Sequence, residues 1–175
     1  MAGGALPVRA LMALSSAVAL LVSACGGNAS SFPAEAECPA PAPLPTIRTA
    51  PGSVSTRAYL TRLRTSSETL VKLRDTLRAS YPDDTFYRRD AFRPDFARYA
   101  DETLCTAQAM LDLAAPDARF ERYETNLDAA LTELIAHTRA GRDAVRQRNT
   151  SDYRDWYKDV DTKTRAVREA AFAQP

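Results

Sequence analysis

The chain contains one histidine, His137, which lies four residues after Glu133. On a helix, this spacing places two potential zinc or iron ligands on one face. A structural zinc site needs four ligands, and a di-iron site in a helical bundle needs a Glu-x-x-His motif from each of two helices. One histidine excludes the di-iron pattern, so we predict no metal site and interpret His137 as a partly exposed helix residue.

A run of four aspartates follows near the C-terminus: Asp152, Asp155, Asp159 and Asp161. The run lacks the D-x-D-x-D-G spacing and the turn glycine of a calcium loop. It alternates with arginine and lysine, which favours a solvated, salt-bridged helix face. The chain also has no C-x-x-C-H, no G-x-S-x-G and no glycine-rich phosphate loop. We therefore predict no catalytic residues, no cofactor and no enzymatic activity.

Cys25 ends a segment that is typical of protein export. Residues 1–9 carry the single charged side chain Arg9, and residues 10–22 form an uncharged apolar run. That run suits a signal peptide and is short for a membrane-spanning helix. The sequence Val22-Ser23-Ala24-Cys25 resembles the lipobox of bacterial lipoproteins, in which an aliphatic residue and two small residues precede the modified cysteine. Plain secretion and an uncleaved anchor are the alternatives.

The resemblance implies that residues 1–24 are removed and that Cys25 receives a thioether-linked diacylglycerol. In many bacteria an amide-linked fatty acid such as palmitate is added as well. Two or more acyl chains give stable anchoring, whereas one chain binds a membrane only reversibly. The expected location is the extracytoplasmic face of a bacterial cell membrane.

Residues 25–53 are predicted to be a lipidated, disordered tether rich in proline and alanine. Its centre is Cys38-Pro39-Ala40-Pro41-Ala42-Pro43-Leu44-Pro45. Alternating prolines remove backbone donors, disfavour helix and keep the chain near polyproline II, so the segment reads as a semi-rigid spacer. A proline-rich ligand for a recognition module is the alternative interpretation.

Cys38 and Cys105 are the two cysteines that remain once Cys25 is assigned to lipidation. An even pair in an exported protein favours a disulfide. This bond would close a loop of 67 residues and contribute about 4 kcal/mol in the chain-entropy treatment. It would leave only residues 26–37 as a free stalk. The alternative is a buried Cys105 and a free Cys38.

Residues 54–173 are predicted to form an all-α domain. Apolar residues recur every three or four positions, which predicts amphipathic helices at about 55–80, 94–114, 116–148 and 151–173. Helices joined by short connections favour an antiparallel four-helix bundle with up-down-up-down topology. Gly141 falls inside the third helix, where glycine costs about 1 kcal/mol relative to alanine, so we expect a close helix crossing there.

Charge gives little evidence of a partner. Removal of residues 1–24 takes Arg9 and no acid, which leaves 22 of 23 basic residues against 22 acidic ones. A neutral chain argues against nucleic-acid binding. Arg139, Arg142 and Arg146 form a basic stripe that would complement the dipole at a helix end. Contact with anionic lipid or wall polymer is the alternative for this stripe.

Two functions remain open. The organisation resembles small helical-bundle lipoproteins of high-GC bacteria, and no functional residues carry over from that resemblance. The first function is a protein-interaction module of the cell envelope, which would expose an aromatic patch around Phe86, Phe92 or Trp156. At its spacing from Tyr153 and Tyr157, Trp156 also fits a core position.

The second function is a carrier for a lipid or small molecule in the bundle core. It predicts a cavity of at least ~300 Å³, placed beside small side chains. The candidates are Ser66, Ser67, Thr138 and Gly141.

Overall fold

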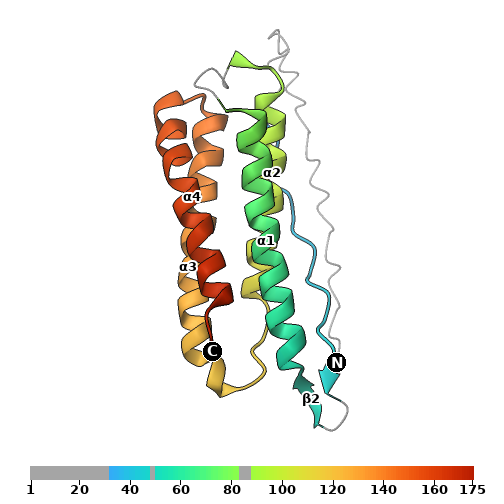
Figure 1. The fold of residues 1–175 in the computed structure, drawn as a ribbon. Helices are drawn as coiled ribbons and strands as arrows, with labels where there is room; N and C mark the ends of the chain where they lie inside the picture. The colour runs from blue at the N-terminus through green and yellow to red at the C-terminus, as the bar shows by residue number, and fades with distance from the viewer. Residues whose placement is uncertain (1–31, 48–49, 83–87) are drawn as a thin grey trace, which may run out of the picture. The chain divides into compact units, whose positions relative to one another are not determined.

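The structure is a computed structural model that describes residues 32–47, 50–82 and 88–175, apart from the side chains of 47 and 50–53. The described chain contains four long helices, each packed against its two neighbours in the cycle, so the predicted all-α four-helix bundle is confirmed (Figure 1). The helices are α1 (Thr56–Ser80), α2 (Phe92–Leu111), α3 (Glu121–Arg146) and α4 (Thr150–Phe172). A short 3₁₀ turn, η2 (Ala118–Phe120), leads into α3.

Capping side chains define two helix starts. The Ser55 hydroxyl accepts a hydrogen bond from the Ala58 amide, and the Asn149 side chain accepts one from the Asp152 amide. These bonds satisfy amides that have no partner within the first helical turn. We predicted that Pro94 would be the first residue of the second helix. In the structure it is the third residue of α2, which begins at Phe92. Proline is tolerated there because the first four amides of a helix need no intrahelical acceptor.

A two-stranded antiparallel hairpin precedes α1. Strand β1 (Thr46–Ile47) pairs with β2 (Ala50–Val54), and the Ser55 amide donates to the Pro45 carbonyl at 3.2 Å. The hairpin corrects the prediction that residues 25–53 are disordered throughout. Thr46 and Ile47 are β-branched and follow the last of the alternating prolines, so β-structure becomes possible at this point.

The buried side chains divide into two clusters. The aliphatic cluster includes many leucines and joins the start of α1 to the ends of α2 and α4. The aromatic cluster joins the end of α1 to the starts of α2 and α4. Its rings belong to Tyr81, Phe92, Phe96, Tyr99, Tyr153 and Trp156. Burial in this cluster raises the pKa of Tyr99 to about 12.

Gly141 marks the close contact between α3 and α4. A Cβ placed on Gly141 would lie 2.6 Å from Cδ1 and 2.7 Å from Nε1 of Trp156. Trp156 is buried and packs edge-on against Phe96, with ring centroids 5.0 Å apart. The indole therefore has little room to move, and the predicted close crossing at Gly141 is confirmed.

Gly141→Ala tests this contact through the sign of its effect. Helix propensity alone would make alanine more stable by about 1 kcal/mol. We expect the clash with Trp156 to reverse that sign and lower the free energy of unfolding by about 1–3 kcal/mol. Urea denaturation measures the change. In a Trp156→Leu background, the same substitution should be neutral or stabilising, and an equal loss in both backgrounds would contradict the proposed clash.

Candidate functional site

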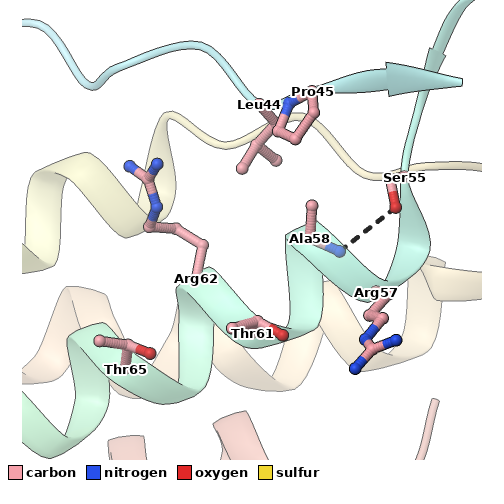
Figure 2. Close-up of a pocket in the computed structure, with 8 residues that line it drawn as sticks. All are labelled: Leu44, Pro45, Ser55, Arg57, Ala58, Thr61, Arg62 and Thr65. Atoms are coloured by element: carbon pink, nitrogen blue, oxygen red, sulfur yellow. Dashed lines mark hydrogen bonds between the residues drawn. The ribbon is translucent and has the colours of Figure 1, made fainter.

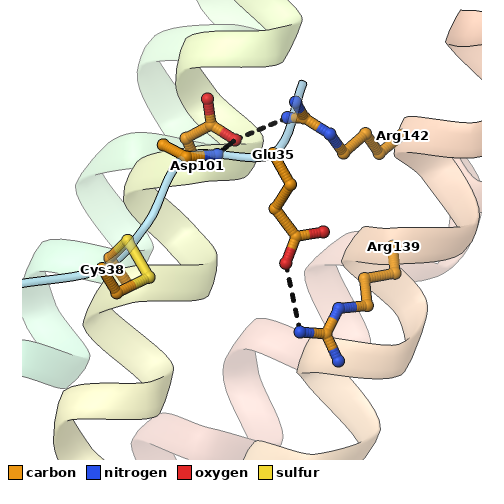
Figure 3. The surroundings of a disulfide bond; sticks show 7 residues. Glu35, Cys38, Asp101, Arg139 and Arg142 are labelled. Carbon is orange, nitrogen blue, oxygen red and sulfur yellow. Dashed lines mark hydrogen bonds and ion pairs between the residues drawn. A yellow bond between two sulfur atoms is a disulfide. The ribbon is translucent and has the colours of Figure 1, made fainter. Parts of the chain in front are cut away.

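A disulfide joins the N-terminal part of the described chain to the bundle. Cys38 is bonded to Cys105 of α2, with the Cα atoms 5.0 Å apart (Figure 3). This confirms the predicted pairing. Cys25, the predicted lipidation site, lies outside the described residues. We call residues 32–45 the docked segment, because their contacts with the bundle extend on both sides of the disulfide.

Arg142 of α3 is the centre of those contacts. Its guanidinium pairs with the Asp101 carboxylate of α2 at 2.6 Å, and it also donates to the Pro33 carbonyl at 2.8 Å. The nitrogen that pairs with Asp101, Nη1, also donates to the Ala97 carbonyl at 3.4 Å. The Arg142 side chain is only 7% exposed, so its charge needs such partners in place of water. The docked segment supplies one of them.

Neighbouring residues strengthen the attachment. The Ala36 amide donates to Asp101 Oδ1 at 3.3 Å, and Glu35 pairs with Arg139 at 3.1 Å (Figure 3). The Phe32 ring lies under the guanidinium of Arg142, 5.2 Å from ring centroid to Cζ. Phe32 also packs against the aromatic cluster. A backbone bond, an ion pair, a ring contact and a disulfide therefore hold residues 32–38 against α2 and α3.

The prediction of a free stalk over residues 26–37 is thus wrong for residues 32–37. The docking was missed because residues 32–37 were grouped with the alternating prolines that follow Cys38, as parts of one tether. Phe32 and Glu35 were the available signal. A large apolar ring and a charged residue contribute nothing to a spacer, and each has a specific partner on the bundle. Residues 26–31 lie outside the described part of the chain.

Each arginine of the predicted basic stripe forms an ion pair with an acidic residue of the same molecule. Arg139 pairs with Glu35, and Arg142 pairs with Asp101. Arg146 pairs with Asp143 at 2.8 Å, one turn earlier on α3. Contact with anionic lipid or wall polymer would have to displace these partners, so the alternative function of the stripe loses support.

The predicted exposed aromatic patch is wrong at two of its three positions. Phe92 and Trp156 are each 3% exposed. The Phe92 ring packs edge-on against Tyr81 and Tyr153, and both large rings belong to the aromatic cluster. The spacing at three and four residues placed Trp156 on the core face of α4. Phe86 lies outside the described residues.

His137 takes part in a structural contact. Its Nε2 lies 3.0 Å from the Trp156 carbonyl, and its ring stacks on the indole with centroids 5.8 Å apart. The carbonyl can only accept, so Nε2 carries the donated proton. Half-burial of the ring lowers the pKa of His137, which favours the neutral form. Glu133 is engaged separately, in an ion pair with Lys163 at 2.9 Å.

Two of the four aspartates of α4 form ion pairs at the surface. Asp155 pairs with Lys158 on the same helix, and Asp161 reaches across to Arg74 and Arg78 of α1. These contacts match the interpretation of a salt-bridged face. In the described part of the chain, no group of three or more histidine, cysteine, aspartate or glutamate residues is arranged to hold a metal ion.

Three of the four small residues named for a core cavity, Ser67, Thr138 and Gly141, are packed. Thr138 is fully buried, and the Trp156 indole fills the space beside Gly141. The Ser67 hydroxyl is buried and donates to the Arg64 carbonyl at 2.8 Å. The gap that a core carrier would need at Gly141 is therefore filled by a neighbouring side chain.

No known protein family, curated protein or solved structure matches this chain. None of the helices in the described ranges has both the length and the apolar character needed to cross a membrane. Inference about function therefore depends on the residues and contacts of the chain itself.

Replacement of Arg142 tests the docked segment. We expect Arg142→Met to lower the free energy of unfolding by about 3 kcal/mol, because it leaves the partly buried Asp101 without its cation. It should also speed proteolysis and amide exchange near Ala36. Arg146→Met is the matched control, because its exposed pair on the same helix contributes under ~1 kcal/mol. Equal effects of the two substitutions would show that the Arg142 cluster does not hold the segment.

Proposed function

We propose that this protein is an exported lipoprotein, anchored through Cys25, whose bundle is a non-catalytic protein-interaction module of the cell envelope. The observation that carries the proposal is the Cys38–Cys105 disulfide, which lies 13 residues after the lipobox cysteine. Structural disulfides persist in oxidising, extracytoplasmic compartments and are rare in a reducing cytosol. The bond and the N-terminal signal therefore support the same location independently.

The docked segment limits how far such an anchor can hold the bundle from the membrane. Phe32 is the first described residue, and it follows Cys25 by seven positions. Seven residues span at most ~25 Å when fully extended. The 26-residue helix α3 is ~39 Å long. The greatest distance between Cys25 and Phe32 is thus shorter than the bundle. We infer that the domain is held beside the lipid surface and not carried on a long stalk.

The chemically versatile side chains support a non-catalytic role. His137 bonds the Trp156 carbonyl, Glu133 pairs with Lys163, and Arg142 pairs with Asp101. Each of these groups satisfies a neighbour within the bundle. A catalytic acid, base or anion-stabilising group needs instead to be directed at a substrate.

A surface at the end of α4 suits a protein partner. Among the described residues, Phe172 is the large apolar side chain that stays exposed, at 44%. The guanidinium carbons of Arg64 and Arg168 lie 5.5 Å and 5.1 Å from its ring centroid. Aromatic residues and arginine are enriched where protein interfaces gain most of their binding energy. We therefore place the partner contact at Phe172, in place of the buried Phe92 and Trp156.

The anchor is tested by Cys25→Ala in the tagged, full-length protein. We expect the unmodified protein in membranes to carry labelled fatty acid, and the variant to lose the label and leave the washed membrane fraction. Ser31→Ala is the control that keeps the cysteine. A variant that stays with the membranes to the same extent would overturn the lipoprotein assignment.

The interaction surface is tested by crosslinking in native membranes. We expect a reproducible crosslinked protein whose yield falls at least tenfold in Phe172→Ala, because this substitution removes the exposed ring. Arg154→Ala, an exposed change near the start of the same helix, should leave the yield unchanged. Equal yields from Phe172→Ala and the unmodified protein would place the contact elsewhere, and the absence of any crosslinked protein would contradict the interaction module.

A further inference from the structure

A groove runs between the docked segment and the outer face of α1, at the end of the bundle where α1 begins (Figure 2). Its volume is about 460 Å³, within the range of roughly 300–1,000 Å³ typical of small-molecule sites. The residues that line it are Leu44, Pro45, Ser55, Arg57, Ala58, Thr61, Arg62 and Thr65.

The walls of the groove are held by contacts with the bundle and with each other. Leu44 is partly buried against the aliphatic cluster. The Pro45 carbonyl accepts the Ser55 amide at 3.2 Å, and the Ser55 hydroxyl accepts the Ala58 amide. The wall formed by the docked segment is thus joined to the first turn of α1, and α1 forms the opposite wall. A ligand would meet a preformed site and would not have to order the walls, which reduces the cost of binding.

The groove is positively charged, and no acidic side chain lines it. Arg57 and Arg62 are the charged residues among those that line it, and none of the lining residues is acidic. Within the described ranges, neither arginine forms an ion pair or a hydrogen bond. Arg74, further along the same helix, instead pairs with Asp75 and Asp161. The first turn of α1 also lacks an acid, so the positive end of its dipole adds to the same field.

The remaining lining residues give the groove both polar and apolar parts. Leu44, Pro45 and Ala58 present apolar surface, while Thr61 and Thr65 present hydroxyl groups beside it (Figure 2). An apolar floor with a few polar groups and a cation is the usual composition of a site for a small organic anion. Arginine is suited to such a ligand because its guanidinium matches carboxylate and phosphate oxygens in pairs.

We propose that this groove binds a small organic acid, in which one carboxylate or phosphate group is attached to a short apolar body. The anion is held by the guanidinium of Arg62 or Arg57 and by the threonine hydroxyls. The apolar body lies against Leu44 and Ala58. The site is separate from the Phe172 surface and does not depend on lipidation of Cys25.

The probes for the test are hexanoate and hexyl phosphate, with hexan-1-ol and hexylamine as matched neutral and cationic compounds. The isotopically labelled full-length protein is titrated in non-ionic detergent, and the amide signals of Ala58, Thr61 and Thr65 are followed by nuclear magnetic resonance. We expect saturable shifts with at least one of the two acids and none with the alcohol or the amine. Added salt should weaken binding, because the exposed charges are screened.

Arg57→Gln/Arg62→Gln removes both charges, and Arg154→Gln/Arg165→Gln removes two exposed charges from α4 as the matched control. Binding of the acid should fall at least tenfold in the first variant and stay unchanged in the second. Equal binding of hexanoate and hexan-1-ol, an equal loss in both variants, or no saturable shift with either acid would each overturn the proposal. Binding of an acidic peptide such as acetyl-Asp-Leu-Asp-amide in place of both acids would also overturn it and indicate a peptide site.

Discussion

The buried charge of Arg142 is the constraint on which the attachment of the docked segment depends. A guanidinium that is withdrawn from water must find acceptors, and those of Arg142 come from outside α3. Asp101 and the Ala97 carbonyl come from α2, and the Pro33 carbonyl comes from the docked segment. The cation therefore ties three separate parts of the chain together. Because removal of any one acceptor would leave a buried donor unsatisfied, the docked segment belongs to the fold and is not an appendage to it.

The two ends of the bundle are stabilised in different ways. The aliphatic cluster relies on leucines of α1, α2 and α3 that meet Val167 and Ala171 of α4, and aliphatic side chains can repack by small adjustments. The aromatic cluster relies on large rings in mostly edge-on contacts, which leave fewer alternative arrangements. Gly141 lies against the aromatic cluster, because only the absence of a side chain lets α3 approach the Trp156 indole so closely.

Periodicity predicted the helices well and the surfaces poorly. Leu63, Leu70 and Leu77 are buried as their spacing indicates, and the cysteine pair followed from counting. The same spacing also fits a core position for Trp156, yet a tryptophan is equally typical of a protein interface. Only the structure could show that its side chain is buried. The burial of Arg142 gave no signal in the sequence. An arginine at a helix end is usually solvated, and its acceptors come from positions 41 and 109 residues away.

The disulfide also determines the path that a mechanical load would take through the molecule. The hairpin and the whole of α1 lie between Cys38 and Cys105, inside the loop that the bond closes. Tension applied at the N-terminus passes from Cys38 directly into the middle of α2 and bypasses the enclosed residues. A molecule pulled at this end would keep α1 and the hairpin unstretched until the covalent bond itself was cut. Reduction of one bond would therefore change which helix is the first to bear force.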